Sequence, residues 1–331
     1  MRSLTDPPPR SATASFDPAF GQRFLLTVDT EEEFDWTKPL TREEHGLEHV
    51  PRMAEFQAFC EDEGVVPVYL VDWPIAQSEL AAEILRGPLA AGKAEIGVQL
   101  HPWNNPPFEE ELTQHNSFAG NLPPELERAK VRGLRDAIER NFEVAPAIYR
   151  AGRYGLGPSS AAMLAESGVA IDTSVRAKFD YSAGEGPNYR RHPLVPYWAD
   201  EEKTLLELPL TTVFWGMLRR QGDWIHPALS RVPRLLGLMA HIGLLERIPL
   251  TPDGVSVDEA IRGIDIALDD GLPVLMLSFH SPSLEPGHTP YVRSAAGLDA
   301  LYDWWRRVFA YLEMRKVGPT TVSAILQAVR R

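Results

Sequence analysis

The sequence contains a single cysteine, Cys60, among 331 residues. An intramolecular disulfide is therefore excluded, and nothing points to an oxidising compartment. No segment reaches the run of about 18 apolar residues that a membrane-spanning helix needs. The first 21 residues hold no apolar stretch able to act as a signal peptide. We therefore expect a cytoplasmic protein without a membrane span.

Basic residues are also scarce, since 33 Lys and Arg stand against 46 Asp and Glu, which gives a net charge of -13. The basic residues form no run or stripe. A nucleic-acid backbone or an anionic lipid surface would on average be repelled, so we expect neither as a partner. The apolar content of 44% and the charged content of 24% are ordinary for a globular protein.

Short apolar runs recur along the chain, and most of them end in polar or charged residues. Helical patterns lie between most of these runs, and this alternation is typical of βαβ units with a mostly parallel sheet. We predict an α/β fold, a distorted and incomplete (β/α)7 barrel, with a doubly wound open sheet as the alternative. Either architecture places its site at the carboxyl ends of the strands. The expected strands lie within 23–30, 65–72, 94–101, 146–153, 169–175, 204–211 and 273–280, and the clearest helices within 76–91, 123–142, 159–167, 255–270 and 294–315.

Three regions of the chain differ in composition. Residues 1–21 are rich in Pro, Ser and Ala without periodicity, and we expect a flexible N-terminal arm there. Residues 22–331 carry the alternating pattern and should form one barrel domain. Within this domain, residues 212–254 are the least barrel-like stretch and contain many aromatic and apolar residues. We interpret them as an insertion or cap that packs on one rim of the barrel.

The first and last expected strands end in residues suited to acid–base chemistry. Asp29 and Glu31 are two positions apart, so on an extended chain they point the same way. They could serve as a base and a metal ligand, as an acid–base pair, or only as part of a solvated acidic loop. His280 follows an apolar run and is well placed as a general acid or base. Ser281 and Ser283 lie nearby, but the absence of a GxSxG elbow argues against a serine hydrolase.

Other strand ends add candidate ligands. His101 follows the third run and precedes a tryptophan and two asparagines. Arg150 and Arg153 flank a turn of small residues after the fourth run. These arginines could hold a carboxylate or an anionic substrate, or form an ion pair at the barrel mouth. Asp172 is expected at the rim, at the end of the fifth run.

Five segments at these strand ends carry a family resemblance when they are taken in order: TVDTEEE, QLHPWNN, RAGRYG, IDTSV and LSFH. They are similar to the motifs TFDDG, HxxxH, RxPxG, an Asp-containing segment and LxH of the polysaccharide deacetylase family. This family is also called the NodB homology domain or carbohydrate esterase family 4. The resemblance covers about residues 22–325 and is closest to a WalW-like branch linked to surface-polysaccharide loci. It implies a (β/α)7 barrel that hydrolyses non-peptide carbon–nitrogen bonds.

The resemblance also implies roles for individual residues. Asp29 matches the general base that activates water, and Arg150 matches the arginine that orients this base. His280 matches the histidine that protonates the leaving amine, and Asp172 matches the carboxylate that tunes this histidine. A backbone amide near Arg153 or the next residue matches the donor to the oxyanion. Amide hydrolysis needs a base, an acid and such a donor, so the set is chemically coherent.

The metal site of the family is altered in this sequence. In the family, the second Asp of TFDDG and both His of HxxxH bind a divalent ion. Here Thr30 replaces that Asp, and Glu31 is the nearest substitute. We expect Glu31 and His101 to hold a divalent metal, zinc in the first place, because oxygen ligands with one imidazole can still bind a metal. A metal-free member is the alternative. The two registers of HxxxH place Gln99 and Trp103, or His101 and Asn105, at the histidine positions.

Trp103, Asn105, Arg153 and Tyr154 are the residues that we expect to bind substrate. The resemblance implies a hydrolase that removes acyl groups, in the first place acetyl, from an acetylated amino sugar or a glycan intermediate of surface-polysaccharide metabolism. Two alternatives stay open: a cofactor-free hydrolase of a small C–N amide, and a non-catalytic glycan-binding barrel. Retention of the base, arginine and acid positions argues for an enzyme.

Overall fold

The computed structural model describes residues 1–35, 38–43, 45–229 and 232–331. The strands of its main sheet are β1 (Arg23–Thr30), β2 (Val68–Val71), β3 (Glu95–Leu100), β4 (Ile148–Ala151), β5 (Ile171–Asp172), β6 (Tyr197–Trp198), β7 (Leu206–Glu207), β10 (Val274–His280) and β11 (Gly318–Pro319). They run in the order β10-β1-β2-β3-β4-β5-β7-β6, with β11 beside β1. Every pair is parallel except β6 with β7.

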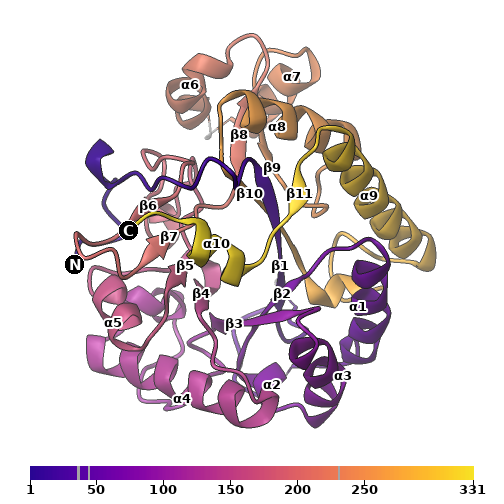
Figure 1. Cartoon of the computed structure of the whole chain (residues 1–331). Helices are drawn as coiled ribbons and strands as arrows, with labels where there is room; N and C mark the ends of the chain where they lie inside the picture. The colour runs from indigo at the N-terminus through magenta and orange to yellow at the C-terminus, as the bar shows by residue number, and fades with distance from the viewer. Residues whose placement is uncertain (36–37, 44, 230–231) are drawn as a thin grey trace.

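Helices form an outer layer around this curled sheet (Figure 1). The expected α/β fold, an incomplete barrel of mostly parallel strands, is confirmed. None of the described helices is both long enough and apolar enough to cross a membrane. The helices of the barrel are α1 (Met53–Asp62), α2 (Trp73–Ala76), α3 (Glu79–Ala90), α4 (Pro124–Phe142), α5 (Ser160–Glu166), α8 (Val257–Asp269), α9 (Ala295–Met314) and α10 (Val322–Ala328).

Side chains alternate along each strand between the interior of the barrel and the helices outside it. In β1, Leu25 joins the interior cluster, whereas Phe24 faces outward and stacks on Phe309 of α9. In β10, Val274 and Met276 lie in the interior in the same way. Residues that continue this alternation past the last apolar position therefore turn their side chains into the open carboxyl end of the barrel.

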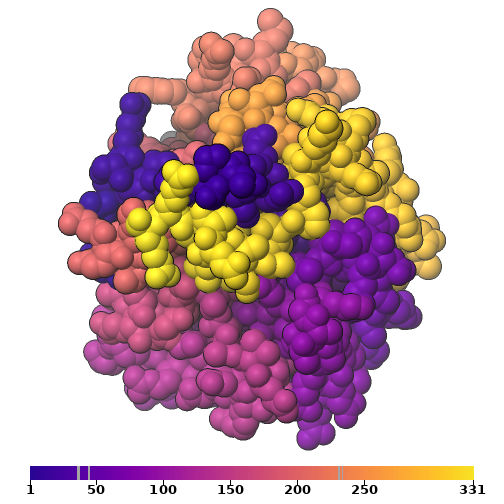
Figure 2. All heavy atoms as spheres, viewed as in Figure 1, coloured from indigo at the N-terminus to yellow at the C-terminus, as the bar shows by residue number. Residues whose placement is uncertain are grey.

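The chain termini close the opposite end. Val322 and Ile325 of α10 pack into the same interior cluster as the first residues of the strands. The N-terminal segment lies against this helix, and a β-bridge joins Phe16 to Val329; Figure 2 shows the two ends of the chain side by side. Residues 1–21, expected to be a flexible arm, are thus packed on the body. The open end of the barrel interior is therefore its carboxyl end, where the strands finish.

Residues 212–254 lie beside the open edge of the barrel. They contain a separate antiparallel pair of strands and two helices, at the top of Figure 1. Leu250 joins this segment to β10, because the backbone N–H of Ser278 donates to the carbonyl of Leu250 at 3.2 Å. The N–H of Leu250 in turn donates to the carbonyl of Thr211 at 3.2 Å. That the segment is an insertion or cap stays a prediction. Its elements are β8 (Thr212–Trp215), α6 (Gly222–Leu229), α7 (Pro233–His241) and β9 (Glu246–Pro249).

Candidate active site

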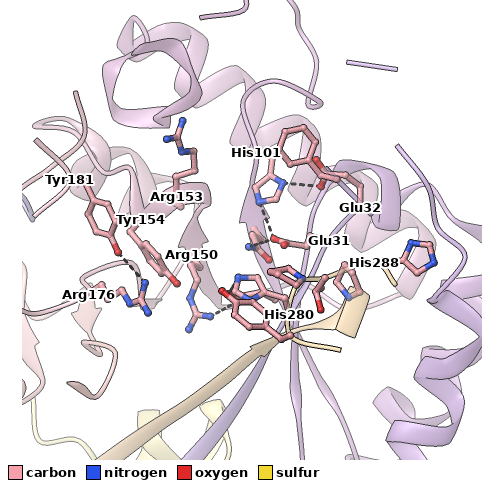
Figure 3. A pocket seen from close by; sticks show the side chains of 18 residues that line it. Glu31, Glu32, His101, Arg150, Arg153, Tyr154, Arg176, Tyr181, His280 and His288 are labelled. Atoms are coloured by element: carbon pink, nitrogen blue, oxygen red, sulfur yellow. Dashed lines mark hydrogen bonds and ion pairs between the residues drawn. The ribbon is translucent and has the colours of Figure 1, made fainter. Parts of the chain in front are cut away.

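Side chains from several strand ends converge on one cavity of about 350 Å³ (Figure 3). The strand register sets their neighbours, since Asp29 pairs with His280 and Gln99 pairs with Arg150. Each lies an even number of positions after an interior residue of its own strand, so its side chain turns inward. The cavity is lined by Asp29, Glu31, Glu32, Phe34, Gln99, His101, Arg150, Ala151, Arg153, Tyr154, Arg176, Tyr181, His280, Pro282, His288, Thr289, Pro290 and Tyr291.

Asp29 is held by a fully buried arginine. Nη1 of Arg150 donates to Oδ1 of Asp29, and the two side chains are 1% and 3% exposed. The guanidinium also donates from Nη2 to Oγ1 of Thr27 at 3.0 Å and from Nε to the carbonyl of Thr173 at 3.2 Å. Three bonds in a rigid planar fork fix the orientation of the carboxylate. The other carboxylate oxygen of Asp29, Oδ2, lies 3.7 Å from Nε2 of His280.

His280 has a carboxylate partner that the sequence did not suggest. Nδ1 of His280 lies 2.7 Å from Oδ2 of Asp253, which follows β9. Burial disfavours the charged imidazolium, but the charge of Glu31 and the hydrogen bond and charge of Asp253 outweigh it. Together they raise the pKa of His280 to about 10. The imidazole is therefore held protonated, with Nε2 facing the cavity and Asp29.

The prediction that Asp172 tunes His280 is wrong. Ile171 joins the interior cluster, so the next residue of β5 points to the outer face of the sheet. There Asp172 accepts a hydrogen bond from Oγ of Ser174 at 2.6 Å and lies beside Glu207. Burial raises the pKa of both carboxyl groups. Asp253 occupies the position that the prediction gave to Asp172.

His101 is enclosed by carboxylates. Its Nδ1 lies 2.9 Å from Oε2 of Glu32 and 3.7 Å from Oδ2 of Asp72, while its Nε2 lies 3.4 Å from Oε2 of Glu31. Burial opposes the charge on the ring, but the two glutamates outweigh it and raise the pKa of His101 well above its usual value. Gly152 makes room for the ring, because a Cβ there would lie 2.4 Å from Cδ2 of His101.

The donors around His101 fit a divalent metal. A hydrogen bond from Nδ1 to the Glu32 carboxylate leaves Nε2 as the ligand atom, which is the usual carboxylate–histidine arrangement at metal sites. On the Nε2 side, Gln99 donates to Oε2 of Glu31 at 3.1 Å. The buried Oε1 of Gln99 has no hydrogen-bond partner among the described residues. Among these residues, the groups of three acidic or histidine side chains with ligand atoms close enough to share an ion are Glu32, Asp72 and His101, on the Nδ1 side of this ring, and Glu33, Glu48 and His288. Glu31 belongs to neither group, so the site on the Nε2 side rests on His101, Glu31 and the buried Oε1 of Gln99.

Trp103 and Asn105 do not line the cavity, contrary to the prediction that they bind substrate. Trp103 is 1% exposed, donates from Nε1 to Oε1 of Glu32 at 2.9 Å and stacks on the ring of His101 with 4.4 Å between centroids. Asn105 is fully buried and donates to the carbonyl of Lys130 at 3.1 Å. Both side chains turn away from the cavity into the packing behind it, where Trp103 supports the histidine.

The opposite side of the cavity carries arginines and tyrosines (Figure 3). Arg153 and Tyr154 line it, and both have left-handed backbones with φ of 54° and 61°. That they bind substrate stays a prediction. Such conformations in residues other than glycine are costly and cluster at functional sites. Arg176 and Tyr181, which the sequence analysis did not single out, complete this side. Whether backbone amides of the 153–154 turn bind an oxyanion stays a prediction.

A buried chain of polar groups anchors Glu31 from behind. Oε1 of Glu33 lies 2.8 Å from Nδ1 of His49, Nε2 of His49 lies 2.9 Å from Oγ of Ser281, and this Oγ accepts from the backbone N–H of Glu31 at 3.3 Å. His49 is fully buried in this chain of groups, whereas His45, four positions earlier, is exposed. Ser281 does not line the cavity, so this chain positions Glu31 and supplies no nucleophile.

Comparison with known proteins gives likeness in fold only. No family model and no curated protein matches the chain. Solved structures that match include a Mycobacterium smegmatis protein assigned as a polysaccharide deacetylase, at 18% identity over 96% of this chain and 98% of that chain, with a TM-score of 0.49. A peptidoglycan N-acetylglucosamine deacetylase matches at 12% over 96% and 92%, with a TM-score of 0.45.

A 4-alpha-glucanotransferase from Thermococcus litoralis matches at 12% identity with a TM-score of 0.54. This match covers 93% of the present chain and 40% of the glucanotransferase, so the chain spans less than half of that enzyme's length. At these identities the likeness concerns the fold alone. Polysaccharide deacetylases, whose motifs the sequence resembles, are thus among the solved structures to which this chain is similar.

Proposed function

We propose that this protein is a hydrolase that removes an acyl group, acetyl in the first place, from the nitrogen of an amino sugar or glycan intermediate. The carrying observation is the pair of Asp29 and His280, 3.7 Å apart at one cavity, each held by a buried partner of opposite charge. A carboxylate and an imidazole that face each other at one cavity are suited to be base and acid of one reaction. The motif resemblance supports the same chemistry.

Asp29 acts as the base in this proposal. Its Oδ1 is occupied by Arg150, and its Oδ2 is directed toward His280 and the cavity. A water molecule beside Oδ2 would give up a proton to it while the water oxygen adds to the acyl carbon. The buried ion pair holds the carboxylate in place, so little reorganisation is needed when the proton moves.

His280 acts as the acid. The hydrogen bond from Nδ1 to Asp253 leaves the proton on Nε2 facing the cavity. When the C–N bond breaks, Nε2 delivers this proton to the departing amine, and the products are acetate and the free amino sugar. The raised pKa of His280, about 10, keeps the acid form populated at neutral pH. A positioned acid of this kind is worth about 10²–10⁴-fold in rate.

Charge that develops on the carbonyl oxygen needs stabilisation. Backbone amides of the turn at Arg153 and Tyr154 are the proposed donors, and such donors act strongly where water is excluded. Glu31 and His101, with Oε1 of Gln99, would hold a divalent metal, which supplies Lewis acidity toward this oxygen. Hydrogen bonds from Gln99 to the Glu31 carboxylate and between His101 and Glu32 keep both side chains in place for holding the ion. The cytoplasmic location stays a prediction.

Acetate release from N-acetylated amino sugars and their oligomers tests the proposal. The wild type should release acetate and expose a free amine. The variant His280→Ala should be slower by about 10²–10⁴-fold. His115→Ala is the matched control, since that side chain is 51% exposed and lies outside the cavity. A loss of less than threefold in His280→Ala would remove this histidine from the reaction.

A further inference from the structure

Two arginines on one side of the cavity have no carboxylate partner. Arg153 and Arg176 both line the cavity, and among the described residues no acidic side chain forms an ion pair with either. By contrast, Arg150 of the same cavity is paired with Asp29. In a chain with a net charge of -13, two guanidiniums at one cavity without a carboxylate partner among the described residues are an exception that needs a cause.

Aromatic rings and neutral oxygens hold these guanidiniums in place. The guanidinium of Arg176 lies 4.0 Å from the ring centre of Phe179 and 5.0 Å from that of Tyr154, and its Nη1 donates to the hydroxyl of Tyr181 at 3.3 Å. Arg153 lies 4.4 Å over Phe118 and donates to a serine hydroxyl. Ring contacts orient a guanidinium and leave its positive charge uncompensated.

A guanidinium carries five N–H donors, so Arg176 keeps several for a ligand after its one bond to Tyr181. Both arginines are half-buried, where an uncompensated charge is more costly than at the surface. An oxyanion removes that cost and matches the planar donor fork. The cavity is therefore polarised, with carboxylates and histidines on one side and, on the other, arginines that have no carboxylate partner among the described residues (Figure 3).

We propose that the side of the cavity lined by Arg176 and Arg153 is a subsite for an oxyanion, a phosphoryl or carboxylate group carried by the same sugar whose acyl amide reaches Asp29. The inference rests on the proposed function and narrows its substrate to an anionic N-acylated amino sugar. Glu31 and Glu32 repel an anion from the opposite side, so the sugar can bind in only one direction. The neutral acetamido group then lies against the base and the acid.

Calorimetric titration measures binding at the subsite, as a quantity distinct from acetate release. The probes are N-acetylglucosamine, N-acetylglucosamine 1-phosphate and N-acetylglucosaminuronic acid at one ionic strength. At least one anionic sugar should bind the wild type about 10–100-fold more tightly than the neutral sugar, because bonds to charged groups are worth this much. The better of the two anionic sugars identifies the oxyanion as phosphoryl or carboxylate.

Arg176→Gln and Arg153→Gln should each weaken binding of the preferred anionic sugar about tenfold and leave the neutral sugar unchanged. Arg176→Lys keeps the charge and should fall in between, which guards against a folding defect in the Gln variant. Arg132→Gln on the exposed face of α4 makes the same change of net charge outside the cavity and should behave as wild type. Equal binding of neutral and anionic sugars, or equal losses for both in the variants, would overturn the subsite.

Acetate release, measured separately, keeps the two proposals apart. Selective binding of an anionic sugar without any acetate release would support the oxyanion subsite and contradict the proposed hydrolase function. Acetate release from neutral and anionic sugars at equal kcat/KM would uphold the hydrolase and overturn the subsite.

Discussion

The side of the cavity that carries Asp29 and His280 and the side that carries Arg153 and Arg176 are built from different parts of the fold. The first side comes from the ends of two paired strands, whose register places Asp29 next to His280, and Asp29, the proposed base, is buried against Arg150. The second comes from loops after strands, is half-buried and rests on ring contacts. In the proposed reaction, the reacting groups therefore lie on the sheet, which tolerates little displacement, and the recognition groups lie on segments that can vary.

We call the side of the cavity with Asp29 and His280 the strand side, and the side with Arg153 and Arg176 the loop side. The largest effect should come from breaking the buried pair of Asp29 and Arg150 on the strand side. Asp29→Asn removes the base and leaves Arg150 as a buried charge without its partner. Turnover should fall by about 10³–10⁴-fold, the upper part of the range for a general base. The free energy of unfolding should also fall, by about 3–5 kcal/mol, as when one partner of a buried pair is removed. Acetate release and urea unfolding measure the two losses.

The exposed Asp136 of α4 supplies the control, since Asp136→Asn changes the net charge equally and should affect neither quantity. If Asp29→Asn kept its stability while losing activity, the strand side would not depend on the ion pair, and the contrast between the two sides would weaken.

His101→Ala should have the next largest effect, on metal content. Protein purified without chelator should hold close to one divalent ion per chain, and the variant should bind zinc at least about 100-fold more weakly, because it loses an imidazole ligand. Gln99→Ala should weaken zinc binding less, since an amide oxygen is the poorer ligand. Elemental analysis and zinc titration measure both, with His115→Ala as the control. A wild type that binds no zinc yet hydrolyses amides would establish a metal-free hydrolase.

The strand side could be predicted from sequence because its residues obey a period of two. Asp29, Arg150 and His280 each continue the interior-facing positions of a strand, and an apolar run followed by a polar residue reveals this. The same rule, applied to Ile171, would have placed Asp172 on the outer face. The prediction for Asp172 was wrong because it placed every strand end at the rim of the cavity. The alternation of side chains along the strand also decides whether a residue there points inward or outward.

The remaining site residues have no such signal. Asp253 lies in a loop after β9, and only the packing of residues 249–251 against β10 brings it to His280. Trp103 follows His101 by two positions, yet its side chain turns into the packing because the backbone leaves the strand after Leu100. Arg176 is brought to the cavity by a loop without motif. Long-range folding, which single-sequence patterns do not encode, places these groups.

A smaller effect on the strand side should separate Asp253 from Asp172. Asp253→Asn removes the charge that helps to raise the pKa of His280 to about 10, so this pKa should fall. Because the protonated imidazole is the acid, activity is lost as pH rises through its pKa. The alkaline limb of kcat/KM should therefore move to lower pH in Asp253→Asn, and the loss of rate should be largest above neutral pH.

Asp172→Asn provides the comparison. It lies on the outer face beside Glu207 and has no contact with His280, so the alkaline limb should keep its position even if stability changes. A shift of that limb in Asp172→Asn, and none in Asp253→Asn, would restore the original assignment of the tuning carboxylate. The pH dependence of acetate release from pH 6 to pH 11 distinguishes the two outcomes.

The smallest effect should appear on the loop side. Tyr181→Phe removes one hydrogen bond, from Nη1 of Arg176 to the phenolic oxygen at 3.3 Å, and keeps the stacking on Tyr154. Binding of the preferred anionic sugar should weaken about 2–5-fold, the worth of one bond between such groups, with kcat unchanged. Calorimetry measures the affinity, and the neutral sugar is the control. A loss in kcat would contradict the proposed separation of binding from chemistry, because it would show that this loop also affects the reacting groups.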